Sequence, residues 1–394
     1  MTSTMTRIPL VPAVPEALAE ELARRVYFVS EAITGFTLVR SGGEITAVDV
    51  TGAVDAGELT RKLNLVVAGD VLAQRPARPK VVWRIPETGP VRDVYRELVA
   101  RGVAAESGEG LVAVGEPVLS LMDRLDAAIR AIVTEEFGAR EFRYPTLIPA
   151  GALRRTGYLT SFPQYLMAVT RLHGDVDDYR AFLDAVAAGG DVSAALRAHC
   201  GGFDLFLPPT MCFHTYHQYA DGPLPAPELV VTARGKSFRH ESRYRRGLER
   251  LWDFTIREIV FLGPAESVLD RRARLMGRTR AWLESLGLGG RCEVAADPFF
   301  LNETAAARAW SQRLLELKYE LRLPLGAGRD VAVASFNYHE RFFGESFGIR
   351  DAAGEPVFTG CAGFGLERLA YAFLCRYGLD PAAWPDALAG EVAR

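Results

Sequence analysis

Apolar residues recur every three or four positions in several segments of the chain, and this period predicts helices. The spacing occurs in three long segments, at 16–29, 91–102 and 118–137. Gly102 and Gly138 are expected to end two of these helices, because glycine readily adopts the left-handed conformation found just beyond a helix. Residues 172–203 show the same spacing on both sides of Gly189-Gly190 and therefore predict two short helices inserted before the next strand.

Alternation of apolar and polar residues predicts strands elsewhere in the chain. A hairpin is expected over 36–50, around a Gly-Gly turn. The most regular region, 228–262, contains the strands ELVVTARGKSFRHESR and FTIREIVFLG joined by the polar loop YRRGLERLWD. Two more strands are predicted from REFRYPTLIP and EPVFTGCAGFG, and a helix from LERLAYAFLCRYG. Because strands follow one another without helical crossovers, the expected fold is α+β, with an antiparallel sheet flanked by helices.

A stretch rich in glycine and small residues, 103–117, is expected to be a linker. It separates a small α/β amino-terminal domain, residues 1–112, from a larger domain, residues 113–394. A chain of 394 residues is long enough for one large and one small domain.

Composition narrows the classes of protein that fit these elements. Charged residues make up 24% of the chain and the formal net charge is −3, which argues against a protein that wraps nucleic acid through bulk charge. No run approaches about 18 apolar residues, so no membrane span is expected. The start of the chain also lacks the apolar core of a signal peptide. The five cysteines form no CxxC pair, so a reducing, cytoplasmic location without a disulfide framework is expected.

Candidate chemistry first occurs in the second strand of the 228–262 region. Phe254 and Glu258 share one face of FTIREIVF and lie about 13 Å apart at roughly 3.3 Å per residue. That is about the reach of an aminoacyl-adenylate from its base to its amino group. The alternative is an ordinary amphipathic strand with a core phenylalanine and a solvated glutamate.

Arginines are dense where the two strands of this hairpin meet. Arg239 and Glu241 lie in FRHE, at the end of the first strand. The loop adds Arg243, Arg245, Arg246 and Arg250. A guanidinium donates two parallel hydrogen bonds to phosphate, so this loop could clamp a polyphosphate. Solvated loop arginines are the alternative.

The segment GCAGFGLER forms a glycine turn that runs directly into a helix. Arg368 occupies the position where a dinucleotide-binding motif has its third glycine, and no acidic ribose partner follows, which excludes a Rossmann site. A helix N-terminus with an arginine in its first turn makes an anion site. A packing turn with a surface arginine explains the segment equally well.

Cys212 and Cys361 flank these elements and could bind a metal together with Glu258. Two thiolates and a carboxylate leave a fourth zinc position open, as in catalytic sites. His214 and His217 are alternative ligands. The two cysteines could also be ordinary buried side chains that bind no metal.

Together these segments resemble the signature motifs of class II aminoacyl-tRNA synthetases. Residues 118–149 resemble motif 1, the dimer-forming element; FRHE…GLERLWDFTIRE resembles motif 2, and GCAGFGLER motif 3. Within that class the chain is similar to the zinc-dependent seryl branch, and more closely to the amino acid:[carrier protein] ligases. That likeness extends over roughly 115–385. It is carried by the segments TSFPQ, TRLHGD, ADPFF, ASFNYHERFFG and GFGLERLAYAFL.

The resemblance implies a role for each candidate residue. Cys212, Glu258 and Cys361 would hold zinc, whose open position takes the α-amino group of a small amino acid. Arg239 would contact the α-phosphate, Arg368 the terminal phosphates and Arg250 a phosphate. Glu241 would contact the adenine edge, Phe254 its ring face and Asn337 the substrate. ATP, Mg²⁺, a phosphopantetheine-bearing carrier protein and a homodimeric assembly are implied as well.

Two departures from the family pattern bear on cofactors and partners. The acidic Mg²⁺ ligand expected before ASFN is replaced by VAVAS; Asp330, Glu340 and Glu345 are near but out of register. The first 110 residues carry no long charged arm of the seryl tRNA-binding kind, which disfavours tRNA as acceptor. An atypical zinc-dependent tRNA synthetase and a non-catalytic paralogue are the competing interpretations.

Overall fold

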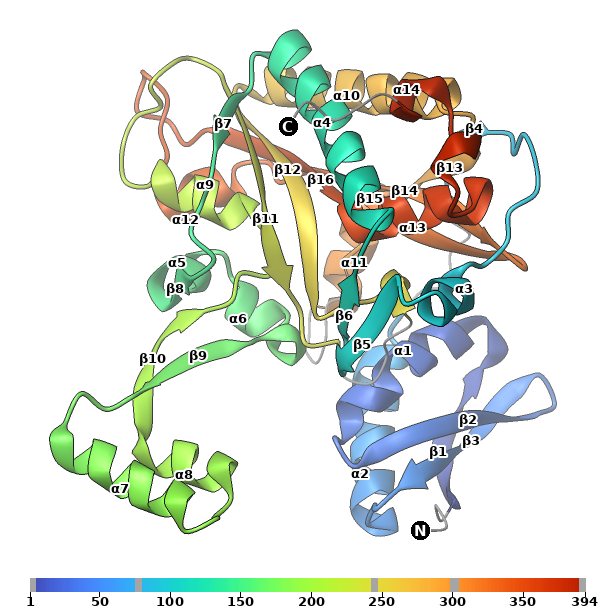
Figure 1. The fold of residues 1–394 in the computed structure, drawn as a ribbon, viewed down its shortest axis with the longest axis vertical. Coiled ribbons are helices and arrows are strands. Elements are labelled where there is room, and N and C mark those ends of the chain that lie inside the picture. The colour runs from blue at the N-terminus through green and yellow to red at the C-terminus, as the bar shows by residue number, and fades with distance from the viewer. Residues whose placement is uncertain (1–4, 75–79, 242–246, 298–304, 390–394) are drawn as a thin grey trace.

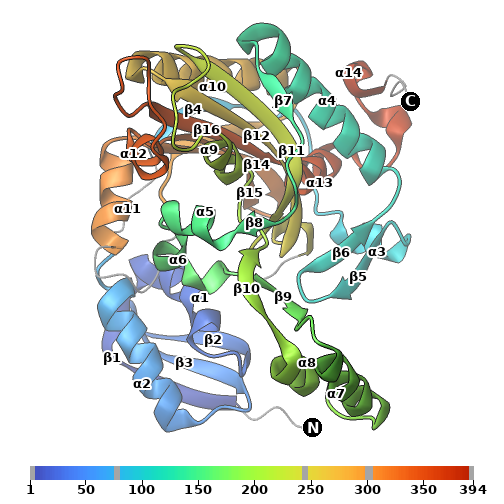
Figure 2. The same cartoon turned by 90° about the vertical axis from the view of Figure 1, so that its left-hand side faces the viewer.

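The protein is described from a computed structural model that covers residues 5–74, 80–241, 247–297 and 305–389 (Figure 1). An eight-stranded sheet with helices on both faces forms the bulk of the molecule. A small amino-terminal sheet domain and a helix-tipped arm both extend from the same end of it in two views (Figures 1 and 2). None of the helices within the described residues combines the length and apolar character that crossing a bilayer requires.

The large sheet is antiparallel except at one edge, as the sequence predicts. Its strands run in the order β4 (Val81–Ile85), β13 (Gly290–Val294), β14 (Lys318–Gly326), β15 (Arg329–Tyr338), β16 (Phe358–Gly365), β12 (Asp253–Gly263), β11 (Leu229–Phe238) and β7 (Arg140–Phe142). Only the edge strand β7 pairs in parallel, with β11. The predicted hairpin of the 228–262 region is the β11–β12 pair, in which Phe254 lies opposite Ser237 and Glu258 opposite Ala233.

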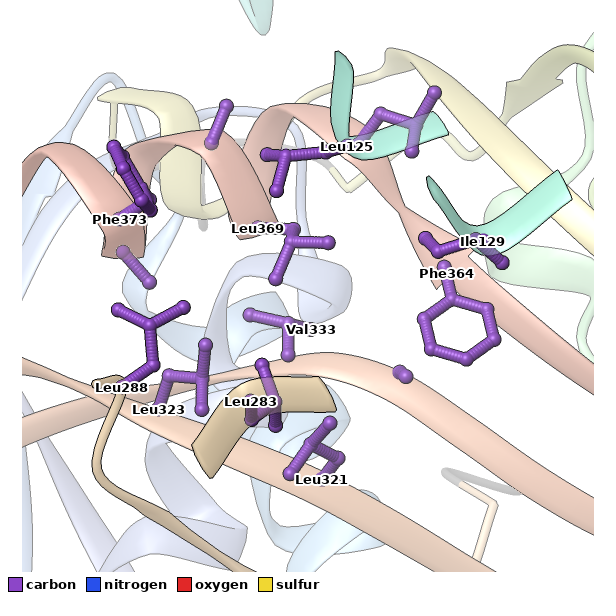
Figure 3. Close-up of a cluster of buried hydrophobic side chains, with 14 of the residues drawn as sticks. Leu125, Ile129, Leu283, Leu288, Leu321, Leu323, Val333, Phe364, Leu369 and Phe373 are labelled. Carbon is purple, nitrogen blue, oxygen red and sulfur yellow. The ribbon is translucent and has the colours of Figure 1, made fainter. Parts of the chain in front are cut away.

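One face of the sheet carries the main apolar core. It is covered by α4 (Val118–Phe137), α10 (Ala265–Ser285) and α13 (Leu366–Tyr377). In Figure 3, Leu125 of α4 and Leu369 of α13 lie above Val333 and Leu321 of the sheet. Helix α4 ends at the predicted Gly138, which has a left-handed φ of 62°.

The opposite face of the sheet is covered by shorter helices and carries a second apolar cluster. These helices are α5 (Ala150–Arg155), α6 (Tyr158–Ser161), α9 (Cys212–Gln218) and α12 (Phe342–Phe347). Because side chains alternate along a strand, Ile259 and Phe261 of β12 enter the main core while Glu258 and Val260 face the second cluster. The chemistry-bearing residues therefore lie on the face with the smaller helices.

The amino-terminal region has its own sheet and its own core. Strands β1 (Met5–Pro15), β3 (Glu44–Gly52) and β2 (Ile33–Ser41) pair in that order against α1 (Ala19–Val29), α2 (Ala56–Val66) and the single turn Val67–Val71. The predicted hairpin at 36–50 is confirmed as β2–β3, and the helix predicted at 16–29 as α1 with a short 3₁₀ turn before it. Ile8, Leu22, Val48 and Leu63 are among the fully buried side chains of this core.

The predicted insertion forms the arm. Strand β10 (Cys200–Phe206) lies between β9 (Ala168–Leu172) and β8 (Ile148–Pro149) and pairs with both. At the tip lie α7 (Val176–Ala187) and α8 (Val192–His199), separated at Gly189-Gly190 as expected. Asp175 and Asp191 cap them by accepting backbone N–H bonds, the usual role of aspartate at a helix start.

The expectation of a linker at 103–117 is wrong. This stretch forms the hairpin β5 (Ala104–Gly108) and β6 (Leu111–Val114). Gly110 occupies its turn with φ of 65°, and a Cβ there would lie 2.3 Å from the ring of Trp252. The glycine therefore serves close packing against the loop before β12, and flexibility is not its role.

Two other expectations need smaller corrections. The helix predicted from residue 91 begins later, as α3 (Tyr95–Ala100). The strand predicted over 140–149 is split into β7 and β8, because Pro145 lies between them and has no N–H for a ladder. The division of the chain at residue 112 stays a prediction. Strand β4 precedes that residue in the sequence but pairs with β13 of the large sheet.

Candidate active site

Three buried side chains from different segments meet on the face of the sheet that the shorter helices cover. Cys212 begins α9, Glu258 lies on β12 and Cys361 on β16. One ligand atom from each lies within 4.8 Å of the others, the only such group of His, Cys, Asp or Glu within the described residues. The strand register explains the meeting, since Val260 pairs with Cys361 and Glu258 with Gly363.

The electrostatics of this Cys–Glu–Cys cluster suit a cation. Burial raises the pKa of Glu258 to about 7 and also raises the pKa of Cys212. The neighbouring Cys212 and burial raise the pKa of Cys361. Three buried acids that discourage one another's ionisation would be stabilised as anions by a dication. The donor set of two sulfurs and one carboxylate fits zinc with an open position.

Polar neighbours orient the three ligands. Thr210 donates a 2.8 Å hydrogen bond to Glu258 Oε2, and Asn337 donates one of 3.4 Å to Cys361 Sγ. His339 Nε2 lies 3.7 Å from the same sulfur. Asn337 was expected on the substrate side from its motif alone. Thr210 and His339 were missed, because their relevance follows only from strand register and from the loop before α9.

The rival ligands His214 and His217 do not join this cluster. His214 is buried and stacks on Tyr144 with ring centroids 5.4 Å apart, and burial lowers its pKa to about 4. His217 is exposed. One helical turn separates the two, so α9 directs them away from the cysteine that begins it.

The arginine-rich end of the β11–β12 hairpin lies along the same face. The Arg239 guanidinium stands 5.3 Å from the centroid of the Phe254 ring, and Arg250 Nη1 donates a 2.9 Å bond to buried Glu241. The residues predicted for adenine and phosphate are thus brought together in pairs. Arg243, Arg245 and Arg246 lie outside the described residues.

Arg368 completes this group from the first turn of α13. Burial and the nearby positive charge of Arg250 and Arg239 lower the pKa of Arg368 to about 10, although Glu241 partly offsets them. A buried guanidinium whose pKa is lowered by other arginines marks a site where an anion is favoured. The motif placed Arg368 correctly at a helix start, but the expected glycine turn is strand β16, which runs to Gly365 and passes directly into α13.

A half-buried ion pair near Arg239 is not predicted by the sequence. Lys318 Nζ donates a 2.6 Å bond to Asp297, and Gln312 donates one of 2.8 Å to the same carboxylate. The sequence pattern does not link residues 297 and 318. They come together only because β13 pairs with β14, with Val294 opposite Tyr319.

The acidic residues considered for Mg²⁺ do not form a group. Asp330 is held by Arg322 and Arg291 at 2.7 Å each. Glu340 adopts a positive φ of 53° in the turn after β15, and Glu345 lies in α12.

Comparisons with known proteins identify relatives of the chain as a whole. No family model matches the chain. It is 37% identical over 303 residues to amino acid–[acyl-carrier-protein] ligase 1 of Bradyrhizobium diazoefficiens, covering 76% of this chain and 90% of that protein. It is 38% identical over 270 residues to ligase 2 of the same organism, covering 68% and 78%.

Seryl-tRNA ligases are more distant relatives. The type-2 serine–tRNA ligase of Methanopyrus kandleri is 27% identical over 339 residues, covering 80% of this chain and 64% of that protein. The crystal structure of M. kandleri SerRS, solved in complex with A. aeolicus tRNASec, matches with a TM-score of 0.70 at 23% identity, over 91% of this chain and 73% of that one. The predicted class II synthetase-like fold is confirmed.

Proposed function

The chain belongs to the family of amino acid–[acyl-carrier-protein] ligases, and on that premise we propose that it activates a small amino acid with ATP and loads it onto a carrier protein. The first product is an aminoacyl-adenylate. The second step transfers the aminoacyl group to the phosphopantetheine thiol of the carrier.

One observation carries the proposal: a single strand, β12, connects the Cys–Glu–Cys cluster to a group of arginines. On β12, Glu258 contributes to the Cys–Glu–Cys cluster while Phe254 lies beneath Arg239. This order matches the two ends of an aminoacyl-adenylate, with the amine at the cluster and the adenine at the ring.

Cys212, Glu258 and Cys361 would hold zinc. Zinc bound there supplies an electrophilic position that takes the α-amino group of the substrate. Asn337 lies beside Cys361 and would orient the same end of the amino acid. A free α-amino group is therefore required of the substrate.

The nucleotide half would use the other end of the strand. Phe254 would stack on adenine and Glu241 accept from its edge, while Arg250 and Arg368 hold the outer phosphates. Arg239 would contact the α-phosphate, and Mg²⁺ would accompany ATP. Because several guanidiniums already repel one another, polyphosphate binding relieves an unfavourable charge distribution.

The chemistry needs no general base. The amino acid carboxylate attacks the α-phosphorus, the bond to pyrophosphate breaks, and pyrophosphate departs with its charge on Arg368. The carrier thiol then loses its proton to solvent and attacks the carbonyl carbon as the thiolate, and AMP leaves with the electron pair of the broken acyl–phosphate bond. Arg239 and Arg368 would contribute alignment and charge neutralisation, the terms that dominate such displacements.

An atypical tRNA synthetase is the second candidate, because the likeness to the serine–tRNA ligase structure covers 91% of this chain. We expect tRNA to be the poorer acceptor. We further propose a homodimer and a cytoplasmic location, following the motif 1 resemblance and the unpaired cysteines.

The test is a competition between acceptors. ATP, zinc, labelled glycine, alanine and serine, total tRNA and a phosphopantetheinylated carrier protein are mixed with the enzyme. Label released from the carrier by mild thiol treatment supports the proposal and names the amino acid. Label on tRNA would make the chain a synthetase, and absence of amino-acid-dependent pyrophosphate exchange would favour the non-catalytic interpretation.

A further inference from the structure

One aromatic side chain of the amino-terminal domain reaches the core behind the candidate active site. Phe28, near the end of α1, packs against the amino-terminal core and also against the cluster that contains Cys212 and Cys361. Within the described residues it is the only side chain that packs against both. Its ring meets that of Tyr165 edge to face, with centroids 5.7 Å apart.

Tyr165 in turn supports the nucleotide half of the site. It is buried at the end of the short 3₁₀ turn Pro163–Tyr165, and its carbonyl accepts a 3.2 Å hydrogen bond from the backbone N–H of His240. Burial and the charge of Glu241 raise the pKa of Tyr165 to about 12, so its hydroxyl stays neutral beside that carboxylate. His240 lies between Arg239 and Glu241, so the contact holds the backbone that presents both.

Glu21 of the same helix forms ion pairs with Arg24 and Arg25 of α1 itself. Burial raises the pKa of Glu21, but these two arginines lower it, and the charge of Arg313 in α11 (Ala305–Leu314) adds a weaker, longer-range attraction that also lowers it. The contact that joins α1 to the part of the chain with the candidate site is therefore the aromatic one.

From these contacts we infer that Phe28 is a positioning residue for ATP, acting through Tyr165 and the His240 backbone. The amino-terminal domain thereby forms part of the adenylation machinery. The inference rests on the proposed roles of Arg239 and Glu241 in binding ATP. Side chains that position a site must themselves be held by packing, and an edge-to-face aromatic pair supplies such a constraint.

The experiment measures ATP affinity by calorimetry and amino-acid-dependent pyrophosphate exchange for wild type and Phe28→Ala. The lost aromatic pair is expected to weaken ATP binding and raise KM for ATP by about 2- to 10-fold. Turnover at saturating ATP, KM for the amino acid and zinc content should be unchanged. Phe28→Tyr keeps the ring and should restore the affinity.

Phe36→Ala is the matched control. Phe36 pairs with Tyr27 inside the amino-terminal domain, with centroids 5.0 Å apart, so its loss disturbs that domain without touching Tyr165. Unchanged ATP affinity in Phe28→Ala would overturn the inference, and so would an equal loss in Phe36→Ala. Wild type that binds ATP yet lacks exchange would overturn the proposed function alone.

Discussion

At the residue scale, the candidate chemistry depends on which side of a strand each residue occupies. Glu258 points to the face of β12 that carries the Cys–Glu–Cys cluster, while Ile259 and Phe261 enter the main core on the other side. A shift of one position would exchange these groups, which the burial of both faces forbids. The consequences of single changes are correspondingly sharp.

Thr210→Val is expected to weaken metal binding by about 10- to 100-fold, the usual effect of removing a partner of a metal ligand. The change deletes the 2.8 Å hydrogen bond to Glu258 without changing the side-chain shape. Zinc affinity is measured by competition with a chromophoric chelator. Thr210→Ser keeps the hydroxyl and should bind like wild type; equal affinity of the valine variant would refute the role.

Arg368→Ala should lower the rate of amino-acid-dependent pyrophosphate exchange by about 10²- to 10³-fold, because a preorganised cation at the departing phosphates is lost. The control is Arg376→Ala on the same helix, whose guanidinium stacks on Tyr377 and bonds to Thr88. A comparable loss in both variants would point to damage of α13 and not to phosphate binding.

At the element scale, a buried ion pair fixes α4 to the sheet. Arg257 of β12 is 2% exposed and donates two 2.7 Å bonds to Asp126 of α4. Such a pair orients the elements it joins, although replacing both partners by apolar groups can be neutral.

Arg257→Met is expected to destabilise the fold by about 3–5 kcal/mol, since Asp126 is left buried with only the more distant Arg234, at 3.5 Å, as a cation. Guanidinium unfolding gives the free energy of unfolding. The double variant Arg257→Met/Asp126→Leu should recover much of the loss. If it is no more stable than the single variant, the uncompensated charge is not the cause.

The Asp297–Lys318 pair makes a prediction about pH. Burial raises the pKa of Asp297, but Lys318 and Gln312 outweigh it and hold that pKa below its ordinary value. The pair's stabilisation is therefore present above the unfolded pKa of about 3.9 and is lost as the pH falls through the lowered folded value. In Lys318→Met, the acid-induced fall in Tm should begin at higher pH.

The measurement is Tm between about pH 3 and pH 7, the range in which carboxylates set acid stability. Lys62→Met serves as the control, because Lys62 pairs with Glu58 on the surface of α2. Coincident profiles for wild type and Lys318→Met would contradict the assignment.

Elements with a strong internal period are predictable from the sequence. Contacts between elements are predictable only where the family resemblance groups residues, as it does for Cys212, Glu258 and Cys361. The β11–β12 hairpin and α4 are confirmed because their patterns are long and regular. The hairpin at 104–114 was read as a linker, since Gly110 signals a turn and a flexible segment alike. Asp297 and Thr210 gained importance only from strands and loops that fold beside them.

At the scale of the whole molecule, the tip of the arm, formed by α7 and α8, packs little apolar surface against the rest of the fold. Helix α7 has no buried residue, and its apolar side chains Val176 and Leu183 are 59% and 62% exposed. Little apolar area is lost if the tip is removed, so the arm tip contributes little to stability.

Replacing residues 173–199 by Asn-Gly should leave Tm and amino-acid-dependent exchange unchanged. Leu172 pairs with Cys200, and Asn-Gly is the favoured two-residue turn between directly paired strands. Differential scanning fluorimetry and the exchange assay check this. A loss of exchange with unchanged Tm would assign the tip a role in activation.

The separation of the Cys–Glu–Cys ligands along the chain links metal binding to folding. These ligands come from α9, β12 and β16, which are distant in sequence and meet only when the central sheet has formed. A metal ion held there would bind the folded protein and not the unfolded chain, so it would add to the free energy of unfolding. A chelator would then lower Tm together with activity.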